Sequence, residues 1–299
     1  MDIIPAAKAN IMLDMSNFDL FQLCKKRFHY RVNLRRSLPV IQKNRALDLG
    51  GLAHKGFEKY YKLLAEGVSF TNRIDAAVLH MRTTASNPDE SNLDVEEVEF
   101  LIKVVIENLD YWRSEDEFLR ILAVEAPFAF TLYEDENIRI IISGMIDLLV
   151  DKPALGGSPE YLNLPIDHKT YSRDSQVLRL SNQFMCYCVA AGSNYLIVNR
   201  VGLQKTVKPD EKYKRAIMSY DPEILQQWKD NVIAVILEEY AACISTGKWP
   251  MNTTSCLKFN RLCEYYEVCE SSGEDAKEHK LMNNYVDMDP WDVTRKMED

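Results

Sequence analysis

Apolar residues in the first third of the chain recur every three or four positions, the spacing that predicts amphipathic helices. One such face runs from Phe18 to Phe28, with Ser16 as the expected N-cap. A second helix is expected to begin at Asp48 and to stop near Gly67. After a polar stretch, a third is expected over about 93–112. This part of the chain is therefore predicted to be helical.

The middle of the chain changes to short runs of β-branched and aromatic residues, which predict strands. Helical spacing returns over about 174–191, before Gly192, and over about 222–245, before Gly247. The expected strands are Leu122–Leu132, Ile138–Ser143, Met145–Val150, Tyr161–Asp167 and Tyr195–Val201. This order of elements predicts an α/β fold with a mixed central sheet flanked by helices.

The chain has 299 residues, of which 46% are hydrophobic, and this is enough to bury one large core. We expect one domain over 1–269, with a helical insert at about 70–115, and a flexible acidic tail over 270–299. No apolar run reaches the roughly 20 residues that a membrane span needs. The first ten residues lack the apolar stretch of a secretion signal. We therefore expect a cytoplasmic protein without a membrane partner.

The formal net charge of −9 argues against a nucleic-acid enzyme until its distribution is considered. The tail after Cys269 holds nine acids against four basic residues, so it supplies much of the excess. The segment from Phe21 to Leu47 holds eight Lys or Arg and no acid. Lys25, Arg27 and Arg31 of this segment are candidates for DNA binding, and solvated helix faces are the alternative.

Two predicted strands carry ionisable residues where apolar ones are expected. Asp147 interrupts an apolar strand, and a buried carboxylate is costly unless something pairs with it. In the next strand, period-two alternation places Asp167 and Lys169 on one face. If the two strands are neighbours, the acids converge and favour a hard divalent cation, with Lys169 neutralising charge on a phosphate. A strand-end ion pair is the alternative for these residues alone.

The wider order of residues resembles the RecB-like branch of the PD-(D/E)XK nuclease superfamily. That pattern has a helical His, a strand Glu, an Asp, a D/E-x-K motif and a Q-x-x-x-Y helix. The matching residues here are His54, Glu125, Asp147, Asp167-His168-Lys169, Gln183 and Tyr187. The one departure is Asp167, where Glu is common, and the family's name records both acids.

The resemblance implies a role for each residue of this pattern. His54, Asp147 and Asp167 would bind the metal together with the main-chain carbonyl of His168, and Glu125 would be a metal or water partner. Asp147, Asp167, Lys169 and Glu125 would form the catalytic set. Gln183 and Tyr187, four residues apart on one helix face, would contact a DNA phosphate or hold Lys169. Ordinary helix packing is the alternative for that pair.

Cysteines form a second constellation, with three of the seven close together at Cys256, Cys263 and Cys269. An odd number without a secretion signal argues for reduced thiols or metal ligands. The layout, with Cys24 far upstream, is similar to the CRISPR-associated and phage iron-sulfur exonucleases. That resemblance implies a 4Fe-4S cluster held by these four thiolates, and a Cys-four zinc site is the competing possibility. The remaining cysteines are expected to be buried apolar residues.

These observations and the resemblance predict a DNA exonuclease that uses Mg²⁺ or Mn²⁺ to hydrolyse phosphodiester bonds at single-stranded ends. The resemblance places it in recombination or repair, phage replication or CRISPR adaptation, in a prokaryotic cell or a phage-infected host. Proteins of those processes would be its partners. The alternative is a module that binds DNA ends or assembles such a complex and cleaves little itself.

Overall fold

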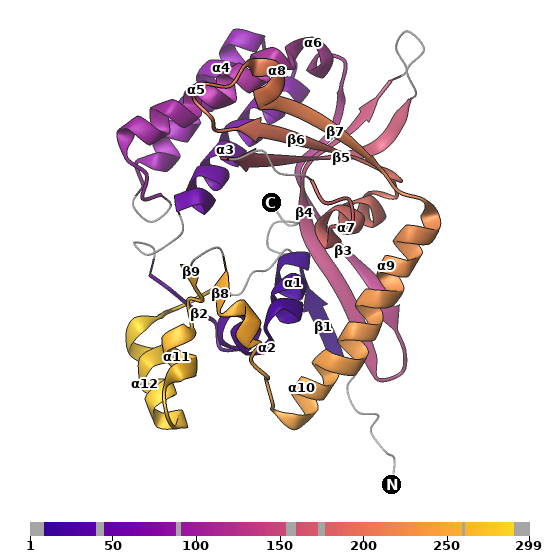
Figure 1. Ribbon diagram of the computed structural model, residues 1–299. Helices are drawn as coiled ribbons and strands as arrows, with labels where there is room; N and C mark the ends of the chain where they lie inside the picture. Colours follow the sequence, from indigo (N-terminus) through magenta and orange to yellow (C-terminus); the bar gives the residue numbers. More distant parts are fainter. Residues whose placement is uncertain are drawn as a thin grey trace. The chain divides into compact units, whose positions relative to one another are not determined.

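A computed structural model describes residues 9–39, 45–87, 91–153, 160–172, 177–258 and 261–289 (Figure 1). The fold is mixed α/β, with a central mixed sheet flanked by helices, as the sequence predicts. The chain divides into two compact units. Unit 1 comprises Met1–Gln42, Ala129–Gly144 and Gln226–Asp299, and unit 2 comprises Lys43–Phe128 and Met145–Leu225.

Hydrogen bonds join the strands of the main sheet in the order β1-β4-β5-β6-β7, with β3 also on β4. The β1–β4 and β5–β6 pairs are parallel, whereas β4–β5 and β6–β7 are antiparallel. The strands are β1 (Ala9–Leu13), β3 (Arg120–Glu134), β4 (Ile138–Lys152), β5 (Tyr161–Tyr171), β6 (Tyr195–Gly202) and β7 (Tyr213–Ser219). Strands β4 and β5, which carry Asp147 and Asp167, are therefore neighbours, and this is the condition under which the two acids can converge.

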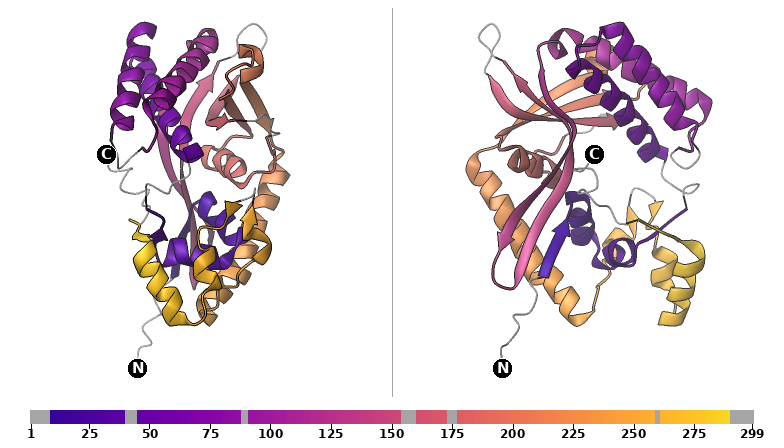
Figure 2. Two further views of the ribbon diagram at one scale, coloured as in Figure 1. Left: turned by 60° about the vertical axis from the view of Figure 1, so that its left-hand side comes forward. Right: turned by 180° about the vertical axis from the view of Figure 1, so that it is seen from behind.

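In unit 2, three long helices pack on one side of the sheet and α7 lies on the other (Figure 2). Their core joins Leu52 and Phe57 of α3 and Leu101 of α5 to Leu148 of β4 and Ile166 of β5. The helices of this unit are α3 (Arg45–Ala65), α4 (Phe70–Ala85), α5 (Val95–Tyr111), α6 (Arg113–Asp116), α7 (Asn182–Ala191) and α8 (Pro209–Lys212). Burial of these apolar side chains fixes α3 against the strands that carry the acids.

Local signals set the ends of these helices. Asp94 caps α5 in a reciprocal capping box with Glu97, so these two residues fix where that helix begins. Gly67, at φ 74°, follows α3, and Gly192, at φ 64°, ends α7, because glycine adopts the left-handed conformation without strain.

Unit 1 is built from short elements around an aromatic core. That core contains Tyr30, Tyr265, Val268, Leu281 and Tyr285, with Cys263 and Cys269 packed against it. Its elements besides β1 are α1 (Met15–Leu23), α2 (Lys25–Phe28), the π-helix η1 (His29–Asn33), β2 (Arg36–Ser37), the π-helix η3 (Ile236–Tyr240), α10 (Ala241–Thr246), the 3-10 helix η4 (Thr253–Ser255), β8 (Leu257–Lys258), β9 (Arg261–Leu262), α11 (Tyr266–Glu270), α12 (Glu274–Asn284) and β10 (Val286–Asp287). Helix α9 (Pro222–Val235) continues from unit 2 into unit 1.

Several elements differ from the sequence-based expectation. The N-cap of α1 is Asp14, whose carboxylate accepts the amide of Asn17, and Ser16 lies inside the helix. Helix α3 already begins at Arg45, so Asp48 lies in its first turn. Helix α7 begins only at Asn182, and residues 174–176 of the longer helix expected there lie outside the described residues. The two strands expected at 138–150 form one strand that runs through Gly144.

The segment after Cys269 also differs from the expected flexible tail. Helix α12 buries Leu281 in the aromatic core of unit 1, and β10 pairs antiparallel with β2. Two apolar anchors, Leu281 and Tyr285, hold a helix whose remaining composition is strongly polar. Residues 290–299 of the predicted tail lie outside the described residues. None of the helices in the described part of the chain is long and apolar enough to cross a membrane.

Candidate active site

The two acidic residues meet where β4 and β5 stop pairing. The antiparallel register runs from Lys152–Tyr161 to Leu148–Ile166, and the next residue of each strand is Asp147 or Asp167. The carboxylate of Asp147 accepts the main-chain amide of His168 at 2.8 Å. A side chain therefore takes the place of the next strand-to-strand hydrogen bond, which fixes the Asp147 carboxylate against the D-x-K segment.

His54 of α3 lies beside Asp147, with Nδ1 3.4 Å from a carboxylate oxygen. Burial raises the pKa of Asp147, but the hydrogen bond and charge of His54 outweigh it and bring the pKa to about 2. Burial lowers the pKa of His54, and its contact with Asp147 more than compensates, so the pKa of His54 is raised. Asp147 is therefore ionised at neutral pH and available as a ligand.

Asp167 is fully buried and carries a charge that the protein only partly compensates. One of its carboxylate oxygens accepts Lys169 Nζ at 2.8 Å, and the other has no hydrogen-bond partner among the described residues. Burial raises the pKa of Asp167 to about 6, Lys169 opposes this rise, and the charge of Asp147 adds to it. A buried carboxylate oxygen without a partner fits a cation ligand, because a cation would supply the missing counter-charge.

Glu125 reaches the same place from β3. Its backbone has φ 51°, a left-handed conformation that costs free energy for any residue other than glycine. Strained backbone of this kind is common at functional sites, where it changes the direction of a side chain. His54, Glu125 and Asp147 each offer a ligand atom within 4.8 Å of the others. Burial raises the pKa of Glu125, as do the charges of Asp147 and Glu58. One imidazole and two carboxylates form a donor set that can hold a divalent metal ion.

The pair Gln183 and Tyr187 lies on one face of α7, as the spacing predicts, and Gln183 Nε2 donates to the Tyr187 hydroxyl at 2.9 Å. Tyr187 is buried, and burial raises its pKa well above 10, with the charges of Asp147 and Asp167 adding to the shift. Tyr187 therefore lies within electrostatic reach of both acids. Its ring packs edge-on against Phe128 of β3, with the centroids 6.0 Å apart.

The candidate DNA-binding residues Lys25, Arg27 and Arg31 belong to unit 1, whereas the acids belong to unit 2. Lys25 pairs with Glu239 at 2.5 Å. Arg27 and Arg31 share the carboxylate of Glu264 at 3.2 and 3.3 Å. Both guanidinium groups keep further donors beyond the one shared carboxylate oxygen, so they retain the capacity to meet a phosphate.

The four cysteines singled out by the sequence lie together in unit 1. Burial raises the pKa of Cys269 to about 11, and the thiols of Cys263, Cys24 and Cys256 contribute to the shift. The amide of Asn252 donates to Cys24 Sγ at 3.4 Å, and the amide of Cys263 donates to the carbonyl of Cys256 at 2.7 Å. Cys269 therefore lies within electrostatic reach of the other three thiols. The remaining cysteines, Cys186, Cys188 and Cys243, are buried as expected.

Two residues near the acids were not anticipated from sequence. Asn199 of β6 and Asn108 of α5 are buried, and Asn199 lies 2.9 Å from a ring nitrogen of His168. Asn199 stands in a run of apolar residues, Leu196, Ile197 and Val198. The same signal that singled out Asp147, a polar residue in a buried strand, marks Asn199 as well.

A family model for the PD-(D/E)XK nuclease superfamily matches residues 13–270. The chain belongs to that superfamily. This nuclease is therefore a phosphodiester hydrolase of a family that works with divalent metals. Among solved structures, it is similar to the crystal structure of SSO0001, with 10% sequence identity and a TM-score of 0.33. The similarity covers 75% of this nuclease and 76% of that chain. No curated protein sequence matches this nuclease.

Proposed function

We propose that this nuclease is a metal-dependent DNA exonuclease that degrades single strands from an end. The observation that carries the proposal is the set of residues where β4 and β5 stop pairing. Asp147 accepts the His168 amide there, and buried Asp167 has one oxygen on Lys169 and another without a hydrogen-bond partner among the described residues. Resemblance to the iron-sulfur exonucleases supports the choice of a single-stranded end. Recombination or repair, phage replication and CRISPR adaptation are the settings that the same resemblance suggests.

Five groups of this chain would hold the cation. They are the side chains of His54, Glu125, Asp147 and Asp167 and the main-chain carbonyl of His168. When bound, Mg²⁺ or Mn²⁺ polarises the scissile phosphate and lowers the pKa of the attacking water. The carboxylates of Asp147 and Asp167 would supply the affinity, because both are mostly removed from water.

Lys169 has a separate part in the proposed reaction. Its side chain is 41% exposed, and its ammonium group donates to an Asp167 carboxylate oxygen at 2.8 Å. It can therefore donate toward a phosphate oxygen that gains negative charge in the transition state. It can equally orient the attacking water, since an ammonium has three donors and Asp167 uses one.

We also propose that Cys24, Cys256, Cys263 and Cys269 hold a 4Fe-4S cluster, with zinc as the competing metal. Burial raises the pKa of Cys269 and of Cys263, and the charges of Lys26 and Arg27 oppose this rise only in part. A bound metal would supply the positive charge that the thiolates need. Anaerobically purified protein should be brown, with the broad visible absorption of iron-thiolate bonds and with iron and sulfide in equal amounts. A colourless protein that contains zinc would contradict the cluster.

The test of the nuclease proposal uses DNA labelled at either end, single- or double-stranded, with Mg²⁺ or with Mn²⁺. Wild-type protein should shorten single strands progressively, and Asp167→Asn and Lys169→Ala should abolish this loss of label. Asp151→Asn is the matched control for Asp167→Asn, because Asp151 is also a largely buried acid, on the neighbouring strand β4, but pairs with Arg120. Cleavage by Asp167→Asn at the wild-type rate would contradict the proposal.

A further inference from the structure

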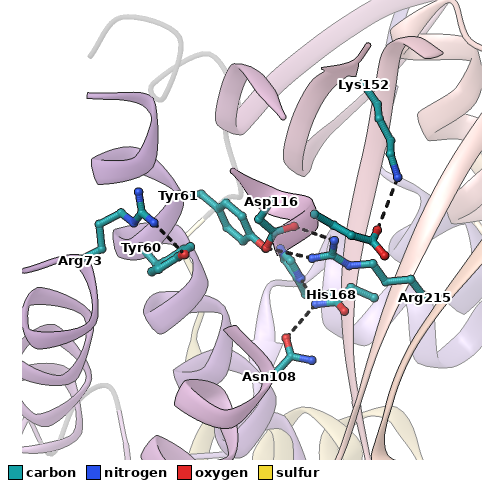
Figure 3. A network of polar contacts seen from close by, with 10 residues as sticks. Tyr60, Tyr61, Arg73, Asn108, Asp116, Lys152, His168 and Arg215 are labelled. Carbon is teal, nitrogen blue, oxygen red and sulfur yellow. Dashed lines mark hydrogen bonds and ion pairs between the residues drawn. The ribbon is translucent and has the colours of Figure 1, made fainter. Parts of the chain in front are cut away.

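The side chain of His168 lies among polar partners on the face of β5 opposite Asp167 and Lys169. Asn199 Nδ2 of β6 is 2.9 Å from His168 Nδ1 and 3.2 Å from Asn108 Oδ1 of α5. When His168 carries its proton on Nε2, the Asn199 amide donates one proton to each partner. His168, Asn199 and Asn108 are at most 2% exposed, so these bonds form away from water. They link two strands and a helix, and Figure 3 shows Asn108 and His168 within this network.

The same imidazole is held by aromatic rings of α3. The His168 ring stacks with Phe57 at a centroid distance of 4.3 Å and with Tyr61 at 5.6 Å. The hydroxyl of Tyr61 donates to Asp116 at 2.8 Å, and Asp116 pairs with Arg215 of β7 at 2.6 and 3.1 Å (Figure 3). The ring that stacks on His168 is therefore fixed in its turn by a buried ion pair.

Stability alone does not account for this arrangement. The surroundings are apolar, with Leu148, Ile166 and Ile197 in the same core. Burying an imidazole and two amides there costs free energy that hydrogen bonds only offset, whereas apolar side chains of similar size would pack without that cost. Three polar atoms of these residues, Asn199 Oδ1, Asn108 Nδ2 and His168 Nε2, have no partner in the described part of the chain. The network is thus a poor way to stabilise a core and an effective way to fix one ring.

Holding the His168 ring in place would also hold the main chain of His168, which is part of the proposed site. Its amide donates to Asp147 at 2.8 Å, and its neighbours in sequence are Asp167 and Lys169. A rotation of this residue would move the amide away from Asp147. The same rotation would turn the adjacent carboxylate and ammonium groups.

We infer that Asn199 and Asn108 are positioning residues, which hold the His168 ring so that the main chain between Asp167 and Lys169 keeps the geometry that metal binding needs. The inference rests on the proposed metal site. Outer groups of this kind, acting through a ligand rather than on the metal, change metal affinity by about 10- to 100-fold when removed. Asn199 is expected in that range. Asn108 should have a smaller effect, because it touches His168 only through Asn199.

The test measures Mn²⁺ affinity of the purified full chain from the electron paramagnetic resonance signal of free Mn²⁺. Asn199→Leu keeps the volume but removes the donor, and His168→Phe keeps the stacked ring but removes the acceptor. Each should weaken Mn²⁺ binding by about 10- to 100-fold. The variant that carries both substitutions should bind Mn²⁺ as tightly as the single variant with the lower affinity. The two losses should not add, because the two residues act as one unit.

Val201→Ala is the matched control, since Val201 is a buried residue of β6 two positions from Asn199 and lacks a polar group. It should lower the melting temperature while leaving Mn²⁺ affinity at the wild-type value. Wild-type affinity in folded Asn199→Leu would overturn the inference and leave the metal site standing. Wild-type protein that binds no more Mn²⁺ than Asp167→Asn would overturn the metal site itself, and the inference with it.

Discussion

Lys169 and Asp167 are in contact, yet the proposed reaction gives them different tasks. Asp167 would offer a cation the carboxylate oxygen that has no partner among the described residues, and Lys169 would offer donors to the substrate. Lys169→Met should therefore still bind Mn²⁺ but cleave labelled single strands at least about 100-fold more slowly, which is the scale of one positioned donor. Calorimetric titration with Mn²⁺ and single-turnover cleavage of the same preparation would measure the two properties separately.

Asp167→Asn is the counterpart of that experiment, because it should lose Mn²⁺ binding and cleavage together. The two variants would then separate ligand from donor. If Lys169→Met lost Mn²⁺ binding to the same extent as Asp167→Asn, the division of tasks would be wrong. Lys169 would then be no more than the ion-pair partner that keeps Asp167 charged.

His168 makes the stability of the protein depend on pH. Burial lowers the pKa of its side chain to about 3, whereas an unfolded histidine has a pKa of about 6.5. Between these values the unfolded chain takes up a proton that the folded chain does not. The contribution of His168 to stability is thus present above pH of about 6.5 and is lost as the pH falls.

From pH 6 to pH 5, the free energy of unfolding of wild-type protein should fall by about 1 kcal/mol more than that of His168→Phe. Urea denaturation at both pH values, with a chelator present, would measure the difference. Because both proteins keep Asp147 and Asp167, the comparison isolates the imidazole. Equal falls in the two proteins would mean that His168 protonates in the folded state.

Sequence reveals the acids of the site but not what holds them. Asp147 and Asp167 can be predicted because a charge in an apolar strand needs a partner, and alternation tells which residues share a face. Asn108 is 91 residues away from Asn199, so no local pattern shows that they meet. The left-handed backbone of Glu125 is likewise set by tertiary contacts, and its own residue type disfavours it.

At the scale of elements, one buried ion pair joins three segments of unit 2. Asp116 ends α6, Arg215 lies on β7, and Tyr61 of α3 donates to the carboxylate. The Arg215 guanidinium is almost fully buried, and although burial opposes its charge, Asp116 keeps its pKa above the ordinary value. Arg215→Met should therefore cost about 3–5 kcal/mol of unfolding free energy, because it leaves Asp116 buried and unpaired.

Combining Arg215→Met with Asp116→Leu should recover most of that loss, since the unpaired charge is gone and the volume is filled. Urea denaturation of the three variants would give the coupling free energy. If the double variant were as unstable as the sum of both single variants, the ion pair would not be the cause.

The same scale shows why some elements could be predicted and others could not. Alternation in β4 and β5 and the capping residues of α5 are local signals, and the structure contains those elements. Strand β7 is not predicted because the two charged residues Lys214 and Arg215 interrupt its alternation of apolar and polar residues. Arg215 is nevertheless buried, because it pairs with Asp116. Helix α12 was missed because two anchors, Leu281 and Tyr285, hold an otherwise polar segment.

At the scale of the whole molecule, the chain has two compact units with separate candidate centres. The acids and their network lie in unit 2, and the four cysteines lie in unit 1. The cysteines come from both ends of the chain, so a cluster would cross-link Cys24 to the segment 256–269 within unit 1. Metal binding of this kind contributes to folding, because the unfolded chain has no preformed site.

Loss of one thiolate should therefore affect unit 1 and spare unit 2. We expect Cys24→Ser to lose most of its iron and to melt at a lower temperature, while Mn²⁺ affinity stays at the wild-type value. Iron analysis, thermal melting and Mn²⁺ titration on one preparation would measure all three. Cys243→Ala is the control, because Cys243 is a buried cysteine of unit 1 outside the group of four. Equal loss of iron in both variants would show that general destabilisation of unit 1, and not a missing ligand, releases the metal.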